Sequence, residues 1–449
     1  MHSVTAAEPR YKISIHRNYQ QCEEEIWNRS TLVDRQLPHQ QLIPHLEKQR
    51  KAKGCKLRQH IITVLCYLLR LPFALLNITQ RPFNQRARQH PQSIVVIKPC
   101  CLGDLLMTTP LLEVIRHAYP EASITYLAGT WSKVIPEHHP AVNAVIDCDT
   151  VGIPGRYNLN DYMKIVGNLR RHHFDLAFVL DRSPLLALLP WLAGIPRRVG
   201  PDSLGRGFSL TDRVPVSSSA EQLQHQAEIY LDLARAIGLP IGTPRMHFEP
   251  TAEERQTVSH PQLMRVALFT GGGSNPGMEL TAKRWPLEHF RELAQKLISK
   301  LGAQILLIGG PGDVALNQRL SAELDAPDGT VTDITGKTSI GELAAQLEQC
   351  DLFIGNDSSP MHLAAAVNIP VIAIFGPTSP QEYGPYPPDD PKHVAIWRHP
   401  TGKPCFFLGK MQTCTHCTCM QAVTVDDVWS AVQRLLGPAV QSRQEESRL

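Results

Sequence analysis

The stretch Ile94-Val-Val-Ile-Lys-Pro-Cys-Cys-Leu-Gly-Asp-Leu-Leu-Met-Thr-Thr-Pro110 decides the fold class. It predicts a buried strand, a tight turn at Leu102-Gly103 and a helix that begins at Asp104. A carboxylate at the mouth of a strand–turn–helix unit lies where open α/β sheets bind their ligands, beyond the carboxyl end of a strand. An Asp at a helix start also caps free N–H groups. This stretch alone therefore leaves both ligand binding and capping open for Asp104.

A second stretch, Asp351-Leu-Phe-Ile-Gly-Asn-Asp-Ser-Ser-Pro-Met-His362, repeats the order of strand, polar turn and helix. Asp357, Ser358 and Ser359 lie at the predicted helix start, where free N–H groups and the helix dipole attract a phosphate. His362 lies on the following turn, near the same end of the helix. The chain thus carries two polar strand ends of the kind that bind ligands in α/β proteins.

Short apolar runs alternate with amphipathic helical patterns from residue 93 onward, which predicts parallel sheets with helices on both faces. A Pro- and Gly-marked stretch at 238–244 interrupts the alternation and predicts a connection between two domains. The same layout then repeats, so the predicted fold class is α/β with two Rossmann-like domains facing one another across a cleft. We expect a basic, partly helical extension at 1–92, a first domain at 93–240, a linker at 241–262, a second domain at 263–437 and a polar tail at 438–449.

The individual elements follow from the same periodicities. In the first domain we expect strands at 94–98, 123–127, 143–147, 175–180 and 196–199, with helices at 104–118, 160–171 and 220–237. In the second we expect strands at 266–269, 304–308, 351–355 and 370–375, with helices at 286–301, 314–324, 338–349, 360–367 and 425–436.

Four short motifs follow one another along the chain: Gly103-Asp104 with Thr109-Pro110, Lys283-Arg284-Trp285-Pro286, Asp357 to His362, and Gly376-Pro377-Thr378. In this order and spacing they resemble the glycosyltransferase family 9 heptosyltransferases. These are two-domain GT-B enzymes that move a heptose from ADP-heptose to the lipopolysaccharide core. Each motif alone is weak, but four in the family's order are strong. The resemblance covers roughly residues 93–435.

The resemblance implies an inverting glycosyltransferase with two kinds of site residue. Asp104 matches the family's general base, which takes the proton of the acceptor hydroxyl. Lys283 matches the lysine that neutralises the departing diphosphate. Backbone N–H groups of a glycine-rich turn and of a helix start are expected to approach the same diphosphate; they belong to Gly272, Gly273, Ser274, Ser358 and Ser359.

Three further polar residues have two readings each. Asp357 either holds sugar hydroxyls or caps its helix, and His362 either donates to a phosphate or is a satisfied core histidine. Asp313 follows Gly310-Pro311-Gly312 after a predicted strand. It either accepts from ribose hydroxyls, as an acidic residue does in dinucleotide-binding folds, or caps the next helix.

We expect no cofactor and no active-site metal, because GT-B enzymes of this kind work without one. The donor is ADP-heptose or another nucleotide sugar and the acceptor is a lipid-linked glycan, but the sequence does not distinguish among sugars. A Rossmann dehydrogenase is excluded, because no predicted strand is followed by Gly-x-Gly-x-x-Gly. A sugar-nucleotide epimerase of the same architecture and a non-catalytic membrane-surface scaffold stay open as alternatives.

The net charge of +3 conceals an asymmetry, since residues 1–92 hold 15 Lys and Arg against 6 Asp and Glu. This favours an anionic partner, for which we expect a lipid surface reached through residues 48–90, and no nucleic acid. A solvated basic extension stays open as the alternative. The apolar run at 61–80 has Arg70 at its centre, which costs about 2.5–3.5 kcal/mol in a bilayer, so spanning is not expected. An interfacial helix and a helix packed on the catalytic domain stay open.

No signal peptide is visible. We expect a cytoplasmic enzyme, peripheral at the inner face of the inner membrane.

Four of the eleven cysteines cluster within fifteen residues: Cys405, Cys414, Cys417 and Cys419. Cys414-Thr-His-Cys417 has metal-ligand spacing, so a structural metal site is one reading, with free thiols or a disulfide as the other. The remaining cysteines, including Cys100 and Cys101, are dispersed or lie in apolar runs, where Cys acts as a small hydrophobe.

Overall fold

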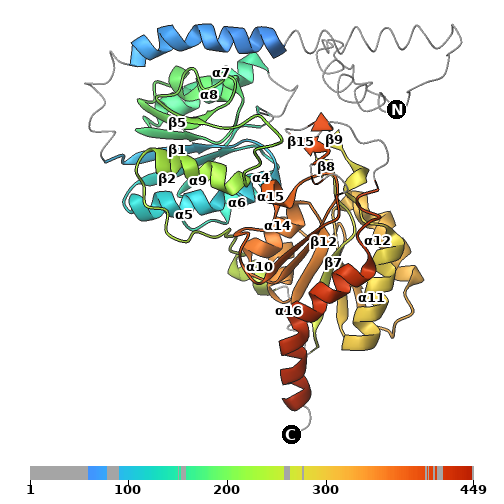
Figure 1. Cartoon of the computed structure of the whole chain (residues 1–449). Helices are drawn as coiled ribbons and strands as arrows, with labels where there is room; N and C mark the ends of the chain where they lie inside the picture. The colour runs from blue at the N-terminus through green and yellow to red at the C-terminus, as the bar shows by residue number, and fades with distance from the viewer. Residues whose placement is uncertain are drawn as a thin grey trace, which may run out of the picture.

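The computed structural model describes residues 59–77, 90–149, 151–152, 158–256, 263–275, 278–399, 402, 404–407, 410–411 and 418–446. Two six-stranded sheets form the centres of the two halves of the molecule (Figure 1). The first has the order β3 (Ala144–Asp147), β2 (Ser123–Ala128), β1 (Ser93–Ile97), β4 (Leu176–Val179), β5 (Arg197–Asp202) and β6 (Asp212–Pro215). The second has the order β11 (Val331–Asp333), β10 (Gln304–Ile308), β7 (Arg265–Phe269), β12 (Leu352–Asn356), β13 (Val371–Phe375) and β14 (His393–Trp397).

All neighbouring strands in both sheets run parallel. Counted within its own half, each sheet has the strand order 3-2-1-4-5-6, which is the Rossmann order. The order in which the strands follow one another reverses between strands 1 and 4 of each sheet, and ligands bind at the carboxyl ends of the strands at such a switch point. In this protein the switch points lie between β1 and β4 and between β7 and β12.

The two faces of β1 show why this sequence forms a central strand. Ile94 and Val96 join one buried cluster with α5 (Thr109–Ala118) and α9 (Gln226–Ala236). Val95 and Ile97 join a second cluster with α7 (Leu159–Arg171) and α8 (Pro184–Leu192). Because side chains alternate across a strand, a continuous apolar run is needed when helices cover both faces. The predicted fold class is confirmed.

The second sheet is built in the same way. Val266 and Leu268 pack with α11 (Leu287–Leu301) and α16 (Val425–Glu446), while Ala267 and Phe269 pack with α13 (Ile340–Glu348) and α14 (Ser359–Ala366). The α13–α14 side belongs to the same buried cluster as the α5–α9 side of the first sheet. The hydrophobic core therefore runs without a break from one half of the molecule to the other.

The predicted helix at 104–118 is wrong in one respect, because it is two helices. α4 (Leu102–Leu106) ends at Met107, and α5 begins at Thr109 with Pro110 in its first turn. Proline suits a first helical turn but not a helix interior. The final helix was predicted to end at Leu436, yet α16 continues to Glu446. Pro438 lies within its bounds, so this proline does not end the helix.

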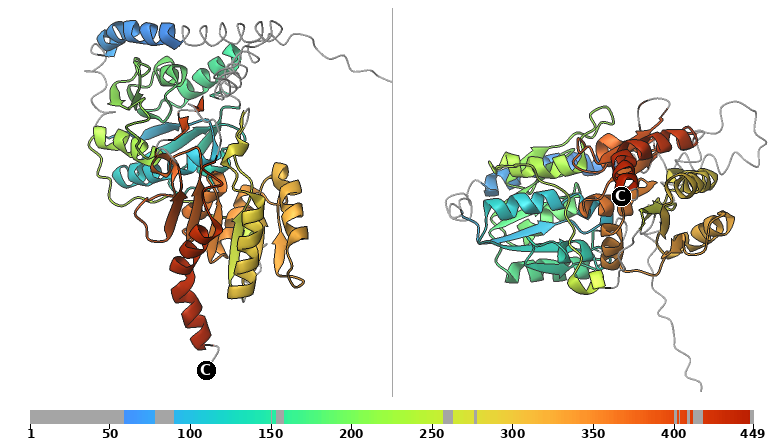
Figure 2. Two further views of the ribbon diagram at one scale, coloured as in Figure 1. Left: turned by 45° about the vertical axis from the view of Figure 1, so that its right-hand side comes forward. Right: turned by 90° about the horizontal axis from the view of Figure 1, so that it is seen from below.

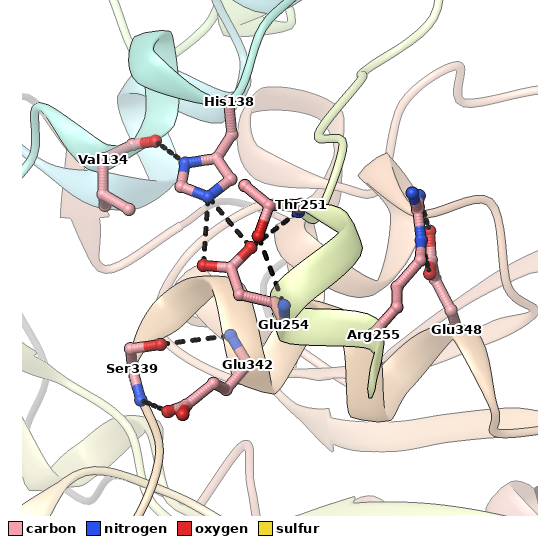
Figure 3. A network of polar contacts seen from close by, with 8 residues as sticks. All are labelled: Val134, His138, Thr251, Glu254, Arg255, Ser339, Glu342 and Glu348. Atoms are coloured by element: carbon pink, nitrogen blue, oxygen red, sulfur yellow. Dashed lines mark hydrogen bonds and ion pairs between the residues drawn. The ribbon is translucent and has the colours of Figure 1, made fainter. Parts of the chain in front are cut away.

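The segment between the halves is tied to both of them (Figure 3). His138 follows α6 (Val134–Glu137) in the first half, and its Nε2 lies 3.1 Å from Glu254 Oε2 on α10 (Ala252–Gln256). Arg255 then pairs with Glu348 of α13, with Nε 2.8 Å from Oε2. This short helix thus contacts the first half through a histidine–carboxylate hydrogen bond and the second half through an ion pair.

The helix Gln59–Asn77 lies at the end of the molecule opposite to the end of α16, beside α7 and α8 (Figures 1 and 2). It is long and apolar enough to cross a membrane by length and composition. One face packs on the first half: the Phe73 ring meets Trp191 at 4.8 Å edge-to-face, and Arg70 pairs with Asp202. A helix packed on the catalytic domain, one of the two readings of the sequence, is thus present.

The other face of this helix is exposed. Its large apolar side chains are between 39% and 69% accessible: Ile61, Val64, Leu65, Tyr67, Leu68, Leu69, Leu71, Leu75 and Leu76. An apolar surface of this extent on one element is unusual for a soluble monomer and marks an interaction surface. We refer to it as the apolar helix face.

Candidate active site between the two sheets

Asp104 lies just beyond the carboxyl end of β1, in the first turn of α4. It does not cap the helix, because Cys101 is the N-cap residue and no side chain makes a cap hydrogen bond there. Asp104 Oδ2 instead lies 3.3 Å from Lys98 Nζ, and its side chain is 33% exposed. Of the two readings of Asp104, the capping reading is wrong.

Lys98 is the last residue before this loop and is almost fully buried. Its Nζ also lies 3.3 Å from Oδ2 of Asp181, which follows β4. Burial lowers the pKa of Lys98, but Tyr230, Asp104 and Asp181 together outweigh burial and raise it well above its ordinary value. A buried ammonium ion therefore joins two carboxylates at the first switch point. The sequence analysis did not identify Lys98 or Asp181, although a lysine that ends a buried apolar strand was a visible signal.

Cys100 and Cys101, between Lys98 and Asp104, are joined by a disulfide. The view of these two residues as small hydrophobes in an apolar run is thus wrong. Cys101 has a φ of 125°, a region that L side chains rarely adopt. The apolar sequence around these two cysteines predicts buried side chains and gives no sign of the bond between them.

The glycine-rich turn after β7 packs tightly against its neighbours. A Cβ at Gly271 would lie 2.2 Å from Asp313 Oδ1, and one at Gly273 would lie 2.0 Å from the Leu280 carbonyl oxygen. Gly272 has a φ of 126° and Gly273 a φ of 75°. These positions require glycine because of both space and backbone conformation. Ser274 continues into the short strand β8 (Ser274–Asn275).

Lys283 and Asp357, far apart in the sequence, form an ion pair in the second half. Lys283 ends the single turn η2 (Thr281–Lys283), and its Nζ lies 2.7 Å from Asp357 Oδ2. The Thr378 hydroxyl donates to the same oxygen at 2.5 Å. The capping reading of Asp357 is wrong, because Ser358 is the N-cap of α14 and no side-chain cap bond is present. The structure thus joins three of the four sequence motifs at one place.

Asn356 holds this site together and was missed in the sequence. It is fully buried; its Oδ1 accepts from the Trp285 backbone N–H at 3.0 Å. Its Nδ2 donates to the carbonyl oxygens of Thr270 and Gly271, at 3.0 and 2.7 Å. Because one side chain satisfies three backbone groups, the glycine-rich turn and the segment after Lys283 keep a fixed distance. A polar residue at the end of an apolar strand was the available signal.

His362 lies where the two halves touch, since α4 contacts α14. A Cβ at Gly103 would lie 3.0 Å from His362 Cδ2. The His362 ring is 3% exposed, and its Nδ1 has no hydrogen-bond partner among the described residues. Burial lowers its pKa to about 4; Asp357 opposes that effect, and His225 and Lys283 add to it. His362 is therefore neutral near pH 7, and the base candidate Asp104 is one residue from this contact.

Asp313 ends the turn η3 (Pro311–Asp313) after β10, and its Oδ2 accepts from the Gly310 N–H at 3.0 Å. It completes a capping box at the start of η3, which leads into α12 (Val314–Glu323), although it makes no side-chain cap bond to α12 itself. The reading as a helix cap is therefore present, at η3 rather than at α12. Its carboxylate faces Gly271, which brings the strand ends of β7 and β10 together.

No group of three or more His, Cys, Asp or Glu side chains suited to a metal ion occurs in the described parts of the chain. Cys414 and Cys417 lie outside them. Cys405 Sγ lies 3.1 Å from His399 Nε2, and Cys419 is buried. A metal site at the cysteine cluster stays a prediction.

Comparison with known proteins agrees with this geometry. Residues 162–415 match the sequence profile of glycosyltransferase family 9 (heptosyltransferase). The chain is 31% identical over 298 residues to lipopolysaccharide heptosyltransferase 2 of Escherichia coli K12, which covers 64% of this chain and 83% of the relative. It is 29% identical over 300 residues to lipooligosaccharide heptosyltransferase 2 of Haemophilus influenzae, covering 64% and 84%.

Two solved structures share the fold. The E. coli ADP-heptose lipopolysaccharide heptosyltransferase II superposes with a TM-score of 0.61 at 25% identity, covering 77% of this chain and 99% of that one. A glycosyltransferase family 9 protein from Veillonella parvula superposes with a TM-score of 0.63 at 23% identity, covering 78% and 98%.

Proposed function

Because this chain belongs to glycosyltransferase family 9, we propose that it transfers a heptose from ADP-heptose to the core of lipopolysaccharide. The relatives named above support the acceptor, since their names state a heptosyltransferase that acts on lipopolysaccharide or lipooligosaccharide. The name of the E. coli structure, an ADP-heptose heptosyltransferase, supports the donor. The same names do not favour the epimerase alternative. The first half, 93–240, would bind the acceptor and the second half, 263–437, the nucleotide sugar.

In the proposed reaction Asp104 is the general base. The acceptor hydroxyl oxygen bonds to the anomeric carbon of the heptose, the bond from that carbon to the diphosphate oxygen breaks, and the hydroxyl proton passes to the Asp104 carboxylate. Inversion follows from this single displacement. The observation that carries the proposal is the position of Asp104, which is partly exposed and one residue from the contact of Gly103 with His362 of the second half.

The second half would hold the leaving group. Lys283 Nζ, held by Asp357, supplies a fixed positive charge beside the glycine-rich turn. The N-terminus of α14, at Ser358 and Ser359, adds the favourable end of a helix dipole. No step requires a metal in this proposal, because Lys283 and the helix start provide the charge that stabilises the diphosphate.

Transfer is tested with purified protein, ADP-heptose and lipopolysaccharide from a strain that lacks heptosyltransferase 2. We expect release of ADP only when this acceptor is present, with a matching increase in acceptor mass. ADP-glucose and UDP-glucose serve as donor controls. Acceptor-independent conversion of the nucleotide sugar would indicate an epimerase and would contradict the proposal.

We further propose that the apolar helix face holds the enzyme on the cytoplasmic leaflet of the inner membrane. Arg70 is engaged with Asp202 on the packed side, so the exposed side carries an uninterrupted apolar surface. The excess of basic residues in 1–92 adds attraction to anionic lipid, at about 1 kcal/mol per nearby Lys or Arg. A helix of this kind lies in the plane of the interface rather than across the bilayer.

Point substitutions test this attachment better than deletion of 1–90, because deletion also removes the packed Phe73 face. Leu68 and Leu71 are 67% and 69% exposed. We expect L68Q/L71Q to sediment less with vesicles of phosphatidylethanolamine and phosphatidylglycerol, with unchanged thermal unfolding. Leu263→Gln, at an exposed leucine (55%) of the second half, is the matched control. Equal sedimentation of the double variant and the control would contradict attachment through this face.

A further inference from the structure

Asp181 is a carboxylate to which neither the sequence motifs nor the proposed reaction give a role. It follows β4, and its side chain is 25% exposed. Its Oδ1 accepts from the Ser183 backbone N–H at 2.8 Å, just before α8. Its Oδ2 accepts a hydrogen bond from Lys98 Nζ at 3.3 Å. The start of α8 thus fixes the Asp181 side chain, and its negative charge is directed at the buried lysine that follows β1.

Lys98 lies between two carboxylates and neutralises only one of them. Its Nζ is 3.3 Å from Asp104 Oδ2 and 3.3 Å from Asp181 Oδ2. The Lys98 side chain is 10% exposed, against 33% for Asp104. No further acidic side chain pairs with Lys98 in the described part of the chain. The three side chains carry one positive and two negative charges, so Lys98 keeps a negative partner when either carboxylate becomes neutral.

The second carboxylate matters because a general base loses its charge when it works. Asp104 becomes a neutral acid when it takes the proton of the acceptor hydroxyl. If Lys98 were paired with Asp104 alone, that step would leave a buried ammonium ion without a counter-charge, which is costly. A carboxylate in that position holds its negative charge and is a weak base. With Asp181 present, the ammonium ion stays paired before and after proton transfer.

We propose that Asp181 is a positioning residue of the transfer reaction, which stays the counter-ion of Lys98 while Asp104 receives the acceptor proton. The inference rests on the proposed function and deepens it, since it concerns the same base. The proton passes from the acceptor hydroxyl to Asp104, an oxygen lone pair forms the bond to the heptose, and the electron pair of the broken bond leaves with the diphosphate. Asp181 exchanges no proton and acts only through Lys98.

Other titratable and charged groups surround these three side chains. They are Tyr126 of β2, Tyr230 of α9, His362 of α14, Glu382 and Tyr383 of α15 (Pro380–Tyr383), and Arg182. Burial raises the pKa of each tyrosine, so all three stay neutral. Burial also raises the pKa of Glu382 to about 7 and lowers that of His362 to about 4. A substitution at Asp181 leaves these groups in place, so differences between variants at this position come from the Asp181 charge.

The experiment measures the single-turnover rate of heptose transfer between pH 4.5 and pH 8, with the enzyme in excess over truncated lipopolysaccharide and with saturating ADP-heptose. Asp181→Asn keeps the shape and the contact with Ser183 but removes the charge. We expect a rate about tenfold lower at pH 7, with ADP affinity unchanged. The fall of the rate at acidic pH should move about one unit lower, because Lys98 then stabilises the charge of Asp104 alone. Asp181→Glu keeps the charge and should be faster than Asp181→Asn.

Asp175→Asn is the matched control, at an aspartate on the other end of β4. The Asp175 carboxylate also accepts backbone N–H groups, those of Gln92 and Ser93 at 2.8 and 3.1 Å, and it should keep the rate and pH profile of the wild type. Thermal unfolding shows whether each variant is folded. If Asp181→Asn does not fold, Asp181→Ser replaces it, because a serine hydroxyl accepts the same kind of turn hydrogen bond without a charge.

The outcomes separate the counter-ion role from a structural role and from the proposed function. A structural role at the start of α8 predicts the reverse order, with Asp181→Asn faster than Asp181→Glu, because only asparagine has the length of the native side chain. That order, or an uncharged variant with the pH profile of Asp175→Asn, overturns the inference while the function stands. If the wild type binds ADP but transfers no heptose to this acceptor, the proposed function fails and the inference fails with it.

Discussion

Asp104 and Asp357 both lie just beyond a central strand, near the start of the helix that follows, and each contacts one lysine. The Asp104 side chain is 33% exposed and lies 3.3 Å from Lys98. The Asp357 side chain is 5% exposed, lies 2.7 Å from Lys283 and also accepts from Thr378. The same pair of residue types thus yields two arrangements. A carboxylate that water reaches can exchange a proton, whereas a buried and doubly bonded one fixes the position of its lysine.

The exposure of the two lysines differs in the opposite sense. Lys98 is buried beneath Asp104 and is shared with Asp181. Lys283 is the more accessible partner of its pair, at 17% exposure against 5% for Asp357. In the first sheet the accessible group is therefore the carboxylate, and in the second it is the lysine ammonium group. This exchange matches the two tasks of glycosyl transfer, which are removal of a proton from the acceptor and stabilisation of a departing diphosphate.

The largest effect should follow from removal of the accessible carboxylate. Asp104→Asn keeps the shape of the side chain and removes the base, so we expect kcat to fall about 100- to 10,000-fold, with ADP affinity unchanged. Lys98 keeps Asp181 as a partner in this variant. Asp161→Asn, at an aspartate of similar exposure that also pairs with a lysine, is the control. If Asp104→Asn turns over at the rate of the control, Asp104 is not the general base.

The next effect tests the other half. Lys283→Ala removes the charge that faces the diphosphate. A charge-assisted hydrogen bond contributes about 1.5–3 kcal/mol, so the affinity for ADP should fall roughly ten- to a hundredfold by calorimetry. Lys296→Ala, which breaks a similar pair with Asp426, should leave ADP affinity unchanged. If the two variants bind ADP equally well, Lys283 does not stabilise the diphosphate.

The comparison also explains what the sequence could and could not predict. The order of strands and helices was predictable because hydrophobic periodicity is local, and the four motifs located both strand ends. The distant partners of Lys98 and Asp357 were not predictable, since Lys98–Asp181 and Lys283–Asp357 join residues more than seventy positions apart. Whether a carboxylate is buried depends on the packing of the whole sheet, and residue type alone does not report it.

Asn356 illustrates the same limit. It is a polar residue whose role comes from backbone groups of other elements, among them the Trp285 N–H. The exposed apolar helix was visible in composition, but its packed face was not, because Trp191 lies more than a hundred residues away from Phe73. The helix break before Pro110 was a local feature that the helical periodicity obscured.

A smaller effect concerns stability at the contact between the halves. The folded-state pKa of His362 is lowered to about 4, whereas in the unfolded chain it is near 6.5. Its contribution is therefore fully present above pH 6.5 and is lost as the pH falls toward 4. Between pH 7 and pH 5 this loss is about 2 kcal/mol. His362→Gln should lose less stability on acidification, as measured by urea unfolding at both pH values. His60→Gln, on an exposed histidine, should behave as the wild type does; identical pH dependence of both variants would contradict the assignment.

The smallest effect concerns Asp313, which extends the comparison to a third strand end of the second sheet. Its Oδ2 is engaged with the Gly310 N–H, so only part of the carboxylate is left for a ribose hydroxyl. A charged acceptor exchanged for an amide at such a hydrogen bond changes affinity by about 1 kcal/mol, or roughly fivefold. We expect Asp313→Asn to weaken ADP binding by that factor and to leave the affinity for 2′-deoxy-ADP unchanged, since the lost contact requires the 2′-hydroxyl. Asp328→Asn, at an exposed aspartate, should change neither affinity. If Asp313→Asn weakens the binding of both nucleotides equally, the residue acts through the turn at Gly310 and Gly271 and not through the ribose. The donor site then lies at two strand ends of this sheet rather than three.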